Sequence, residues 1–208
     1  MALPDLATES DLEAYLQAPV DAAAATVALQ IASAAIRSFT KQVLTFVAQE
    51  TVLLAGGERT LRLPQRPPVV DGDNPLTVVE VADGGGQDCS AVEDRDYTRL
   101  GAELTRSCPW YAPGRYMGWP YSRTQGVWAP RVKVTYSHGY TEIPPDITGV
   151  CLDLAAATLT NPSRLRSETV GGVSQVYTVE TFGTGSLTAS HRDILRSYRR
   201  TALSVAPS

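Results

Sequence analysis

The chain has 208 residues, 43% hydrophobic and 19% charged, a composition typical of a globular protein with one core, or a core plus a sizeable insertion. Its formal net charge of −4 argues against wrapping nucleic acid as the main role, because that role requires many cations facing the phosphates. The cysteines (Cys89, Cys108 and Cys151) are odd in number and form no CxxC pair, which argues against a zinc site or a disulfide scaffold and favours a reducing cytosol.

Residues 1–44 are predicted to form two helices. The opening stretch MALPDLATESDLEAYL has no basic residue and no h-region, so we expect no signal peptide, and no apolar run suggests a membrane span. Ser10 and Glu13 have the spacing of a capping box, which predicts a short helix ending near Leu16. Asp21 is expected to cap a second, longer helix. Its apolar residues recur on one face: Ala24, Val27, Ala28, Ile31, Ala35 and Phe39.

Residues 45–137 lose the helical period and are predicted to form an inserted β-rich region. Gly56-Gly57 predicts a hairpin, and Gly101-Ala102 predicts two short strands around a turn. The last strand of the region alternates between apolar and polar residues. Its apolar side chains are expected to share one face: Val132, Val134 and Tyr136.

An irregular aromatic loop, residues 107–130, lies inside this region and holds all three tryptophans, three tyrosines, four prolines and three glycines. Three interpretations stay open: a loop packed on its own aromatic side chains, a contact surface for another protein, or a platform on which sugars stack. The residues that would carry a protein contact are Trp110, Tyr111, Arg115, Tyr116 and Trp119.

The stretch VKVTYSHGYTEIPPDITGV joins this region to residues 138–208, which are predicted to hold the C-terminal helices. Pro144 and Pro145 fit only the first turn of a helix, and Asp146 places negative charge where the free amide groups point. His138 precedes a glycine at the end of the strand. The stretch is either the edge of an active site or a structural joint, and a turn histidine bonded to backbone is the simpler interpretation.

Residues 165–188 are rich in Gly, Ser, Thr and Val and lie between two predicted helices. A connection this long is usually functional or disordered, and the high β-propensity from Val173 to Phe182 predicts an extended arm or hairpin. Gly171-Gly172 is expected to precede the extended part. The residues expected to pair with another chain are Val173, Val176 and Val179.

The last predicted helix starts near Thr188 or Ser190, and four residues are expected to face inward: Leu187, Ile194, Leu195 and Tyr198. Arginines recur three and four residues apart on the opposite side, forming a basic stripe of Arg192, Arg196, Arg199 and Arg200. The stripe is either a solvated face or a docking surface.

Motifs for catalysis are missing from the sequence. There is no GxSxG, HExxH, Walker loop or strand-linked GxGxxG, and His191 shares no motif with a nucleophile. We therefore predict no catalytic, cofactor-binding or metal-binding residues and no enzyme activity.

Helices flanking antiparallel strands predict an α+β protein: a small helical bundle built from both chain ends, an inserted antiparallel β-rich block, and an extended arm before the last helix. Four pieces occur in order: IASAAIRSFT, VTYSHGY followed by IPPDI, SETVGGVSQVYTV, and SLTASHRDILRSYRR. Together they resemble the head-to-tail connector (adaptor) proteins of long-tailed bacteriophages, especially those infecting actinobacteria. The resemblance covers nearly the whole chain, and the aromatic loop fits it least well.

The resemblance implies a non-enzymatic virion protein without cofactors, assembled in the host cytoplasm and located in the neck between capsid and tail. It implies a ring, usually of twelve subunits, beneath the portal protein. Such a ring extends the channel for double-stranded DNA without binding a specific sequence, contacts no membrane, and offers a surface to the next neck or tail-completion protein. It also implies that the basic stripe docks against the portal, and that SHGYTEIPPD is a joint. The alternative is a carbohydrate-binding module that uses the aromatic loop.

Overall fold

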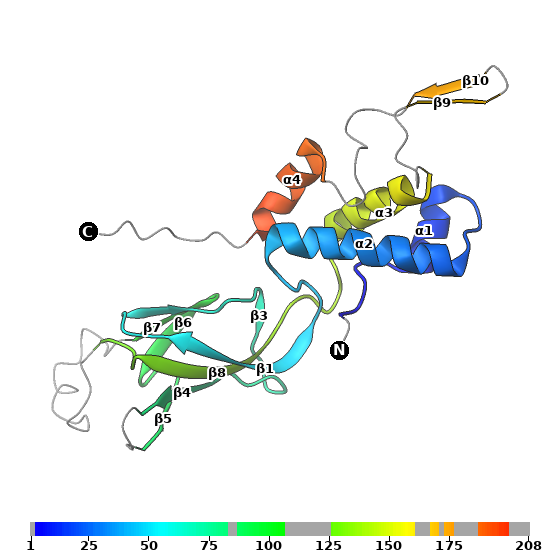
Figure 1. Cartoon of the computed structure of the whole chain (residues 1–208). Helices are drawn as coiled ribbons and strands as arrows, with labels where there is room; N and C mark the ends of the chain where they lie inside the picture. The colour runs from blue at the N-terminus through cyan, green and yellow to red at the C-terminus, as the bar shows by residue number, and fades with distance from the viewer. Residues whose placement is uncertain are drawn as a thin grey trace. The chain divides into compact units, whose positions relative to one another are not determined.

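The structure is a computed structural model that describes residues 3–82, 87–106, 126–160, 167–170, 173–176 and 187–199. It divides into two compact units. The helical unit comprises Met1–Thr45 and Glu142–Ser208, and the β unit comprises Phe46–Thr141. Helices and antiparallel sheets together confirm the predicted α+β class (Figure 1).

The helical unit is organised around its longest helix, α2 (Ala22–Thr40). Three further helices pack against α2: α1 (Glu9–Leu16), α3 (Pro145–Thr160) and α4 (Ala189–Leu195), the last extended by a 3-10 turn, η3 (Arg196–Tyr198). Small residues on the buried face of α2 allow α3 to approach closely. The buried apolar side chains include Leu12, Ala25, Ala28, Leu29, Ala32, Ile36, Ile147, Val150, Cys151, Leu154 and Leu195.

The cap of α1 differs from the prediction by one half-turn. Thr8, not Ser10, is the N-cap: its hydroxyl accepts from the Asp11 amide at 3.2 Å, and the Asp11 carboxylate accepts from the Thr8 amide at 3.0 Å. The Thr8 hydroxyl also donates to the Asp11 carboxylate at 2.6 Å, and this hydrogen bond, together with the one from the Thr8 amide, lowers the pKa of Asp11. Because Thr8 and Asp11 complete a capping box between themselves, the helix begins before Ser10. The predicted Asp21 cap of α2 is confirmed.

One expectation about membranes is corrected by α2. By length and composition alone, α2 is apolar enough to cross a bilayer, although the sequence suggested no such run. Its alanine-rich face is buried under α3 and α1 in this structure. We therefore treat α2 as the core helix of the helical unit, since a buried core helix passes the same test.

The described residues of the β unit form two antiparallel sheets. In the larger one the order is β1 (Val47–Ala55), β8 (Arg131–His138), β4 (Thr77–Val81), β5 (Cys89–Ala91), and the short β3 (Pro68–Val69) also pairs with β8. The smaller sheet has the order β2 (Thr60–Arg62), β7 (Glu103–Arg106), β6 (Tyr97–Leu100). The central position of β8 explains its strongly apolar alternate residues.

The core of the β unit lies beneath β8. The predicted alternation is confirmed, because Val132, Val134 and Tyr136 are fully buried. Side chains from the smaller sheet and from the end of the aromatic loop complete this core: Leu61, Leu63, Tyr97, Leu104 and Trp128.

The predicted hairpin at Gly56-Gly57 is wrong. The strands on either side of it join different sheets, β1 pairing with β8 and β2 with β7. A Cβ at Gly56 would lie 1.9 Å from the Ala129 carbonyl oxygen, and Gly57 has φ of +88°. The glycines are therefore needed where the chain leaves one sheet close to a neighbouring segment and enters the other.

Two short strands form a separate two-stranded sheet in the arm: β9 (Ser167–Val170) and β10 (Val173–Val176). The prediction started the extended part after Gly171-Gly172, but a strand also precedes this pair. Val170 and Val173 are partners across the pair. Within this segment, residues 165–166, 171–172 and 177–186 lie outside the described part of the chain. The expected extension of the strand through Phe182 therefore stays a prediction.

Candidate functional site

The last helix is held against the helical unit by polar contacts at its first turn. Thr188 caps α4 by accepting from the His191 amide at 3.2 Å. The ring of His191 is buried, and its Nε2 lies 2.8 Å from Oδ2 of Asp153 on α3. The other carboxylate oxygen of Asp153 accepts from the Tyr15 hydroxyl at 3.4 Å. This network fixes the rotation of α4.

That rotation corrects the predicted inward face. His191 and Leu195, one turn apart, point into the unit, whereas Ile194 is 39% exposed. The predicted face was chosen by hydrophobicity alone. A buried histidine needs a polar partner, and the sequence does not show that Asp153 supplies it.

A groove of about 480 Å³ lies between α4 and the C-terminal end of α2. Three of its lining side chains are cationic: Lys41, Arg192 and Arg199. The others are Ala35, Ser38, Phe39 and Leu187. We call this the basic groove. The guanidinium of Arg199 lies over the ring of Phe39, 5.3 Å from its centroid, which orients the arginine without neutralising it.

The charges of the basic groove are uncompensated within the described part of the chain. Lys41, Arg192 and Arg199 are exposed, and none of their side chains takes part in a hydrogen bond or ion pair with a described residue. The C-terminus of α2 contributes only about half a negative charge near Lys41. The groove is therefore a positive surface on a chain whose net charge is −4.

The structure divides the predicted basic stripe. Arg192 and Arg199 meet at the groove, Arg196 is exposed on α4's extension but does not line it, and Arg200 lies outside the described residues. Lys41 and Phe39 were missed, because only tertiary packing brings the end of α2 beside α4. Their one sequence signal is that an aromatic residue and a cation stand together at the predicted end of a helix.

The other predicted contact residues are not placed. Trp110, Tyr111, Arg115, Tyr116 and Trp119 lie outside the described part of the chain, as does Val179. Val173 and Val176 are located only as strand residues of β10.

Trp128, the third tryptophan of the loop, is buried, whereas a residue that contacts another protein must be exposed. It is only 2% exposed, and its indole N–H donates to the Leu104 carbonyl at 3.1 Å. Its ring packs against Tyr97, with the centroids 5.6 Å apart. Trp128 is therefore a core residue, and it is unavailable as a sugar platform.

His138 lies at a buried joint at the end of β8. It is 1% exposed, its Nε2 lies 2.6 Å from the Glu50 carboxylate, and its ring contacts that of Tyr136. The simpler prediction, a histidine bonded to backbone, is corrected: the partner is a carboxylate on β1. Within the described residues, no group of three or more His, Cys, Asp or Glu side chains could hold a metal ion.

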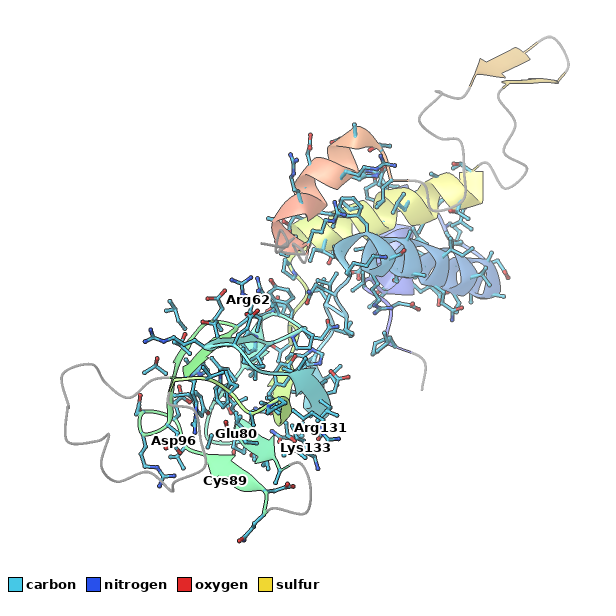
Figure 2. All side chains as sticks on the ribbon, turned by 60° about the vertical axis from the view of Figure 1, so that its left-hand side comes forward. Arg62, Glu80, Cys89, Asp96, Arg131 and Lys133 are labelled. Atoms are coloured by element: carbon cyan, nitrogen blue, oxygen red, sulfur yellow. The ribbon has the colours of Figure 1, made fainter. Side chains whose placement is uncertain are left out.

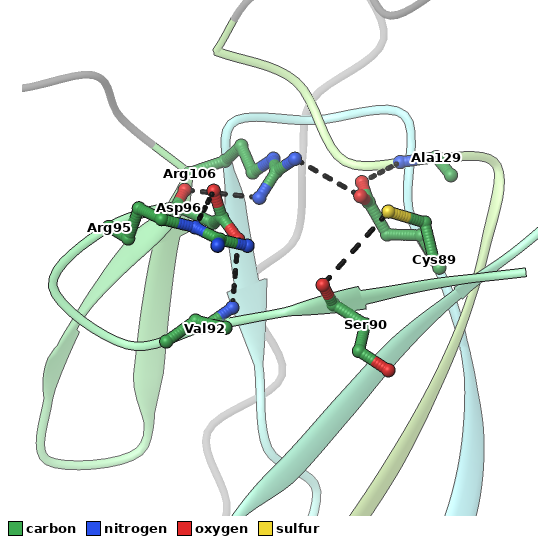
Figure 3. Close-up of polar contacts among 8 residues, drawn as sticks. Cys89, Ser90, Val92, Arg95, Asp96, Arg106 and Ala129 are labelled. Atoms are coloured by element: carbon green, nitrogen blue, oxygen red, sulfur yellow. Dashed lines mark hydrogen bonds and ion pairs between the residues drawn. The ribbon is translucent and has the colours of Figure 1, made fainter. Parts of the chain in front are cut away.

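A buried ion-pair cluster stabilises the β unit (Figure 3). Arg106 donates to the Glu80 carboxylate at 3.1 Å and to the Asp96 carbonyl at 3.1 Å, and its guanidinium lies over the Trp128 ring. The second oxygen of Glu80 accepts from the Ala129 amide at 3.0 Å. Both carboxylate oxygens of Glu80 are thus satisfied, as a buried charge requires. The cluster links the two sheets and is structural.

Few known proteins are similar to this chain. No family model and no curated protein sequence matches it. Among solved structures, it is similar to a chain of one described as "Neck of native GTA particle computed with C12 symmetry". The two chains share 16% identity over 99% of each chain, with a TM-score of 0.49. A likeness of this size assigns no function.

Proposed function

We propose that this protein is a structural virion protein that forms a ring beneath the portal, joins the phage head to the tail, and extends the DNA exit channel. Support comes from the four ordered sequence pieces, which resemble head-to-tail adaptors across nearly the whole chain. The described elements occur in the order that this resemblance implies: two helices, a β block, a joint, a helix, an extended segment and a final helix.

The observation that carries the proposal is the basic groove. Its three cations are exposed and form no ion pair with a described residue, so their charges remain available to a partner. A partner that presents carboxylates would gain ion pairs there and would be steered to the groove during association. We assign this partner role to the portal protein.

The acidic balance of the chain suits a channel for DNA. A net charge of −4 keeps phosphate attraction weak, so that DNA passes without sequence-specific binding. A closed ring requires two different surfaces on each subunit, one for each neighbour. We propose that the ring has twelve subunits, and that the aromatic loop and the arm contribute these contacts and the contact to the next tail component.

Charge reversal in the groove tests the proposal. In the double variant R192E/R199E, attraction becomes repulsion at two positions, and exposed ion pairs contribute roughly 0.2–1 kcal/mol each. We expect binding to purified portal protein to weaken about tenfold at low salt, and its dependence on salt to flatten.

The matched control is R196E, which reverses an exposed arginine that does not line the groove. It should bind portal with nearly the wild-type affinity. Equal binding by R192E/R199E and R196E at low salt would contradict the assignment of the groove to the portal.

A further inference from the structure

The strand β1 lies at an edge of the larger sheet and pairs only with β8 among the described strands. Gly56, just after β1, donates to the Pro130 carbonyl at 2.9 Å, which fixes the alternation of hydrogen bonds along the pair. Leu54 and Val52, two and four positions before Gly56, therefore form their backbone hydrogen bonds with β8. Thr51, Leu53 and Ala55 direct their N–H and C=O groups away from β8, toward the open edge.

The contact between Thr51 and Thr135 supports this assignment. These residues are register partners, and their hydroxyl oxygens lie 2.8 Å apart. Side chains approach most closely in pairs that do not exchange backbone hydrogen bonds, as expected if Thr51 faces its backbone outward.

The residues of β1 themselves carry little of the usual protection against pairing. Proteins block exposed edges with lysine, proline, bulges or very short strands. The nine-residue β1 contains no lysine and no proline, its single charge, Glu50, is bound to His138, and its bulge lies before Glu50. Leu53 is 61% exposed in the unprotected half.

Cations on β8 restrict which strands can pair with the outer edge of β1. Lys133 and Arg131 of β8 are the register partners of Leu53 and Ala55. Figure 2 labels the two cations, which lie close together on the β unit. An incoming strand that carried cations would be repelled at this position, whereas an uncharged or acidic strand would be accepted.

The arm supplies a strand of this kind. β9 and β10 carry no cation, and β10, with the sequence VSQV, carries no charge and no proline. The two strands pair with each other and with no other described strand. An isolated two-stranded sheet is marginally stable in water, so it gains most from a third strand.

The free edge of β10 can be assigned in the same way. Val170 and Val173 are register partners on either side of positions 171–172. Partners next to a connection of two residues normally exchange backbone hydrogen bonds, and we expect the same of this pair. The backbone groups of Ser174 and Val176 therefore point away from β9.

We propose that β10 of one subunit adds to the open edge of β1 in the next subunit, alongside Thr51–Ala55. This inference rests on the proposed function, because the ring supplies the second copy. Backbone pairing supplies the contact, in the manner of strand addition. Each subunit then offers one donor strand and one acceptor edge, which are the two different surfaces that a ring requires.

Cross-linking between full-length chains tests the contact. A chain carrying L53C is mixed with a chain carrying V176C under conditions of ring assembly, followed by mild oxidation. Facing residues of paired strands have Cα atoms about 5.5 Å apart, within the range for a disulfide. We expect covalent dimers that form only when both variants are in the mixture. If the register is shifted by two residues, S174C in place of V176C should give the dimers.

The control mixture is V27C with V176C, since Val27 is also exposed but lies on α2. The native cysteines are present in every mixture, so dimers through them would appear in the control as well. Assembled rings that give no dimers specific to L53C with either β10 variant would overturn the proposal.

A proline variant tests the backbone pairing independently. L53P removes one outward N–H and spares the hydrogen bonds to β8, whereas L53T changes the side chain and keeps the N–H. We expect L53P to reduce ring yield at least about tenfold and L53T to assemble like wild type. If L53P folds and forms rings at the wild-type level, the proposal is wrong. If L53P does not fold, the cross-linking experiment tests the proposal in its place.

Hydrogen exchange separates this proposal from the proposed function. If wild-type rings bind portal but the amides of Thr51, Leu53 and Ala55 exchange as fast as in the monomer, strand addition is wrong and the adaptor function stands. If the wild-type chain forms no ring with portal, both are wrong.

Discussion

Among single residues, the buried pair of Arg106 and Glu80 gives a sharp prediction, because removing Arg106 takes a guanidinium away from a buried carboxylate. Both side chains are almost fully buried, and Glu80 also accepts from a backbone amide. R106M should lower the free energy of unfolding by about 3–5 kcal/mol, since it leaves a buried carboxylate without its cation.

The matched control is R62M, which breaks the pair between Arg62 and Glu103 at the surface of the same unit. Exposed pairs contribute little, so this variant should lose less than about 1 kcal/mol. Urea unfolding of both variants measures the difference. Equal losses would show that burial does not decide the contribution of Arg106.

Cys151 is a second residue whose environment makes a measurable prediction. It is buried between α3 and α2, where its Sγ lies 3.7 Å from the Ser33 hydroxyl oxygen. Burial raises the pKa of the Cys151 thiol to about 11. In the unfolded chain this thiol ionises near pH 8.5, so its contribution to stability is complete below about that pH and falls as the pH rises toward 11.

C151A isolates this contribution. The difference in unfolding free energy between wild type and C151A should shrink between about pH 8.5 and pH 11, because only the wild-type chain has this thiol to ionise on unfolding. Denaturant unfolding across this range measures it. Parallel pH profiles for the two proteins would contradict the assigned burial of the thiol.

At the scale of elements, the passage from β1 to β2 depends on Gly56. A Cβ there would lie 1.9 Å from the Ala129 carbonyl oxygen, too close for any side chain. We expect G56A to lose more than about 2 kcal/mol of stability, because backbone atoms must move. G72A is the control: a Cβ at Gly72 meets nothing within 4 Å. Denaturant midpoints that match for the two variants would contradict the close approach.

The sequence was most informative where one element carries its own pattern. The alternation of β8 and the Asp21 cap of α2 were predicted because neighbouring residues decide them. The cap of α1 was misplaced by two residues even though neighbours decide it, and the larger failures occurred where a distant partner decides. The Gly56-Gly57 hairpin was wrong because β1 finds β8 as its partner, which is not visible in local turn chemistry.

The candidate site shows the same division. Helical spacing predicted that arginines would gather on one side of the last helix, and two of them do line the groove. Lys41 could not be predicted as their neighbour, because it is far away in the chain and joins them only when α2 packs against α4. The inward His191 depended likewise on Asp153, which α3 supplies.

At the scale of the whole molecule, the two units carry surfaces of different physical kinds. The helical unit presents exposed cations in the basic groove, and the β unit presents the outer edge of β1, which pairs with no described strand other than β8. Electrostatic contacts weaken with salt, whereas backbone pairing depends on strand geometry. Attachment to the portal and contact between subunits should therefore respond to different variants, R192E/R199E for the first and L53P for the second.

The proposed function requires that the chain form a ring and that this ring bind the portal. Cryo-electron microscopy of the purified full-length protein, mixed with the portal protein of its phage, tests this most directly. We expect closed rings with an open central channel, bound coaxially beneath the portal. A protein that stays monomeric at high concentration and leaves the portal bare would contradict it.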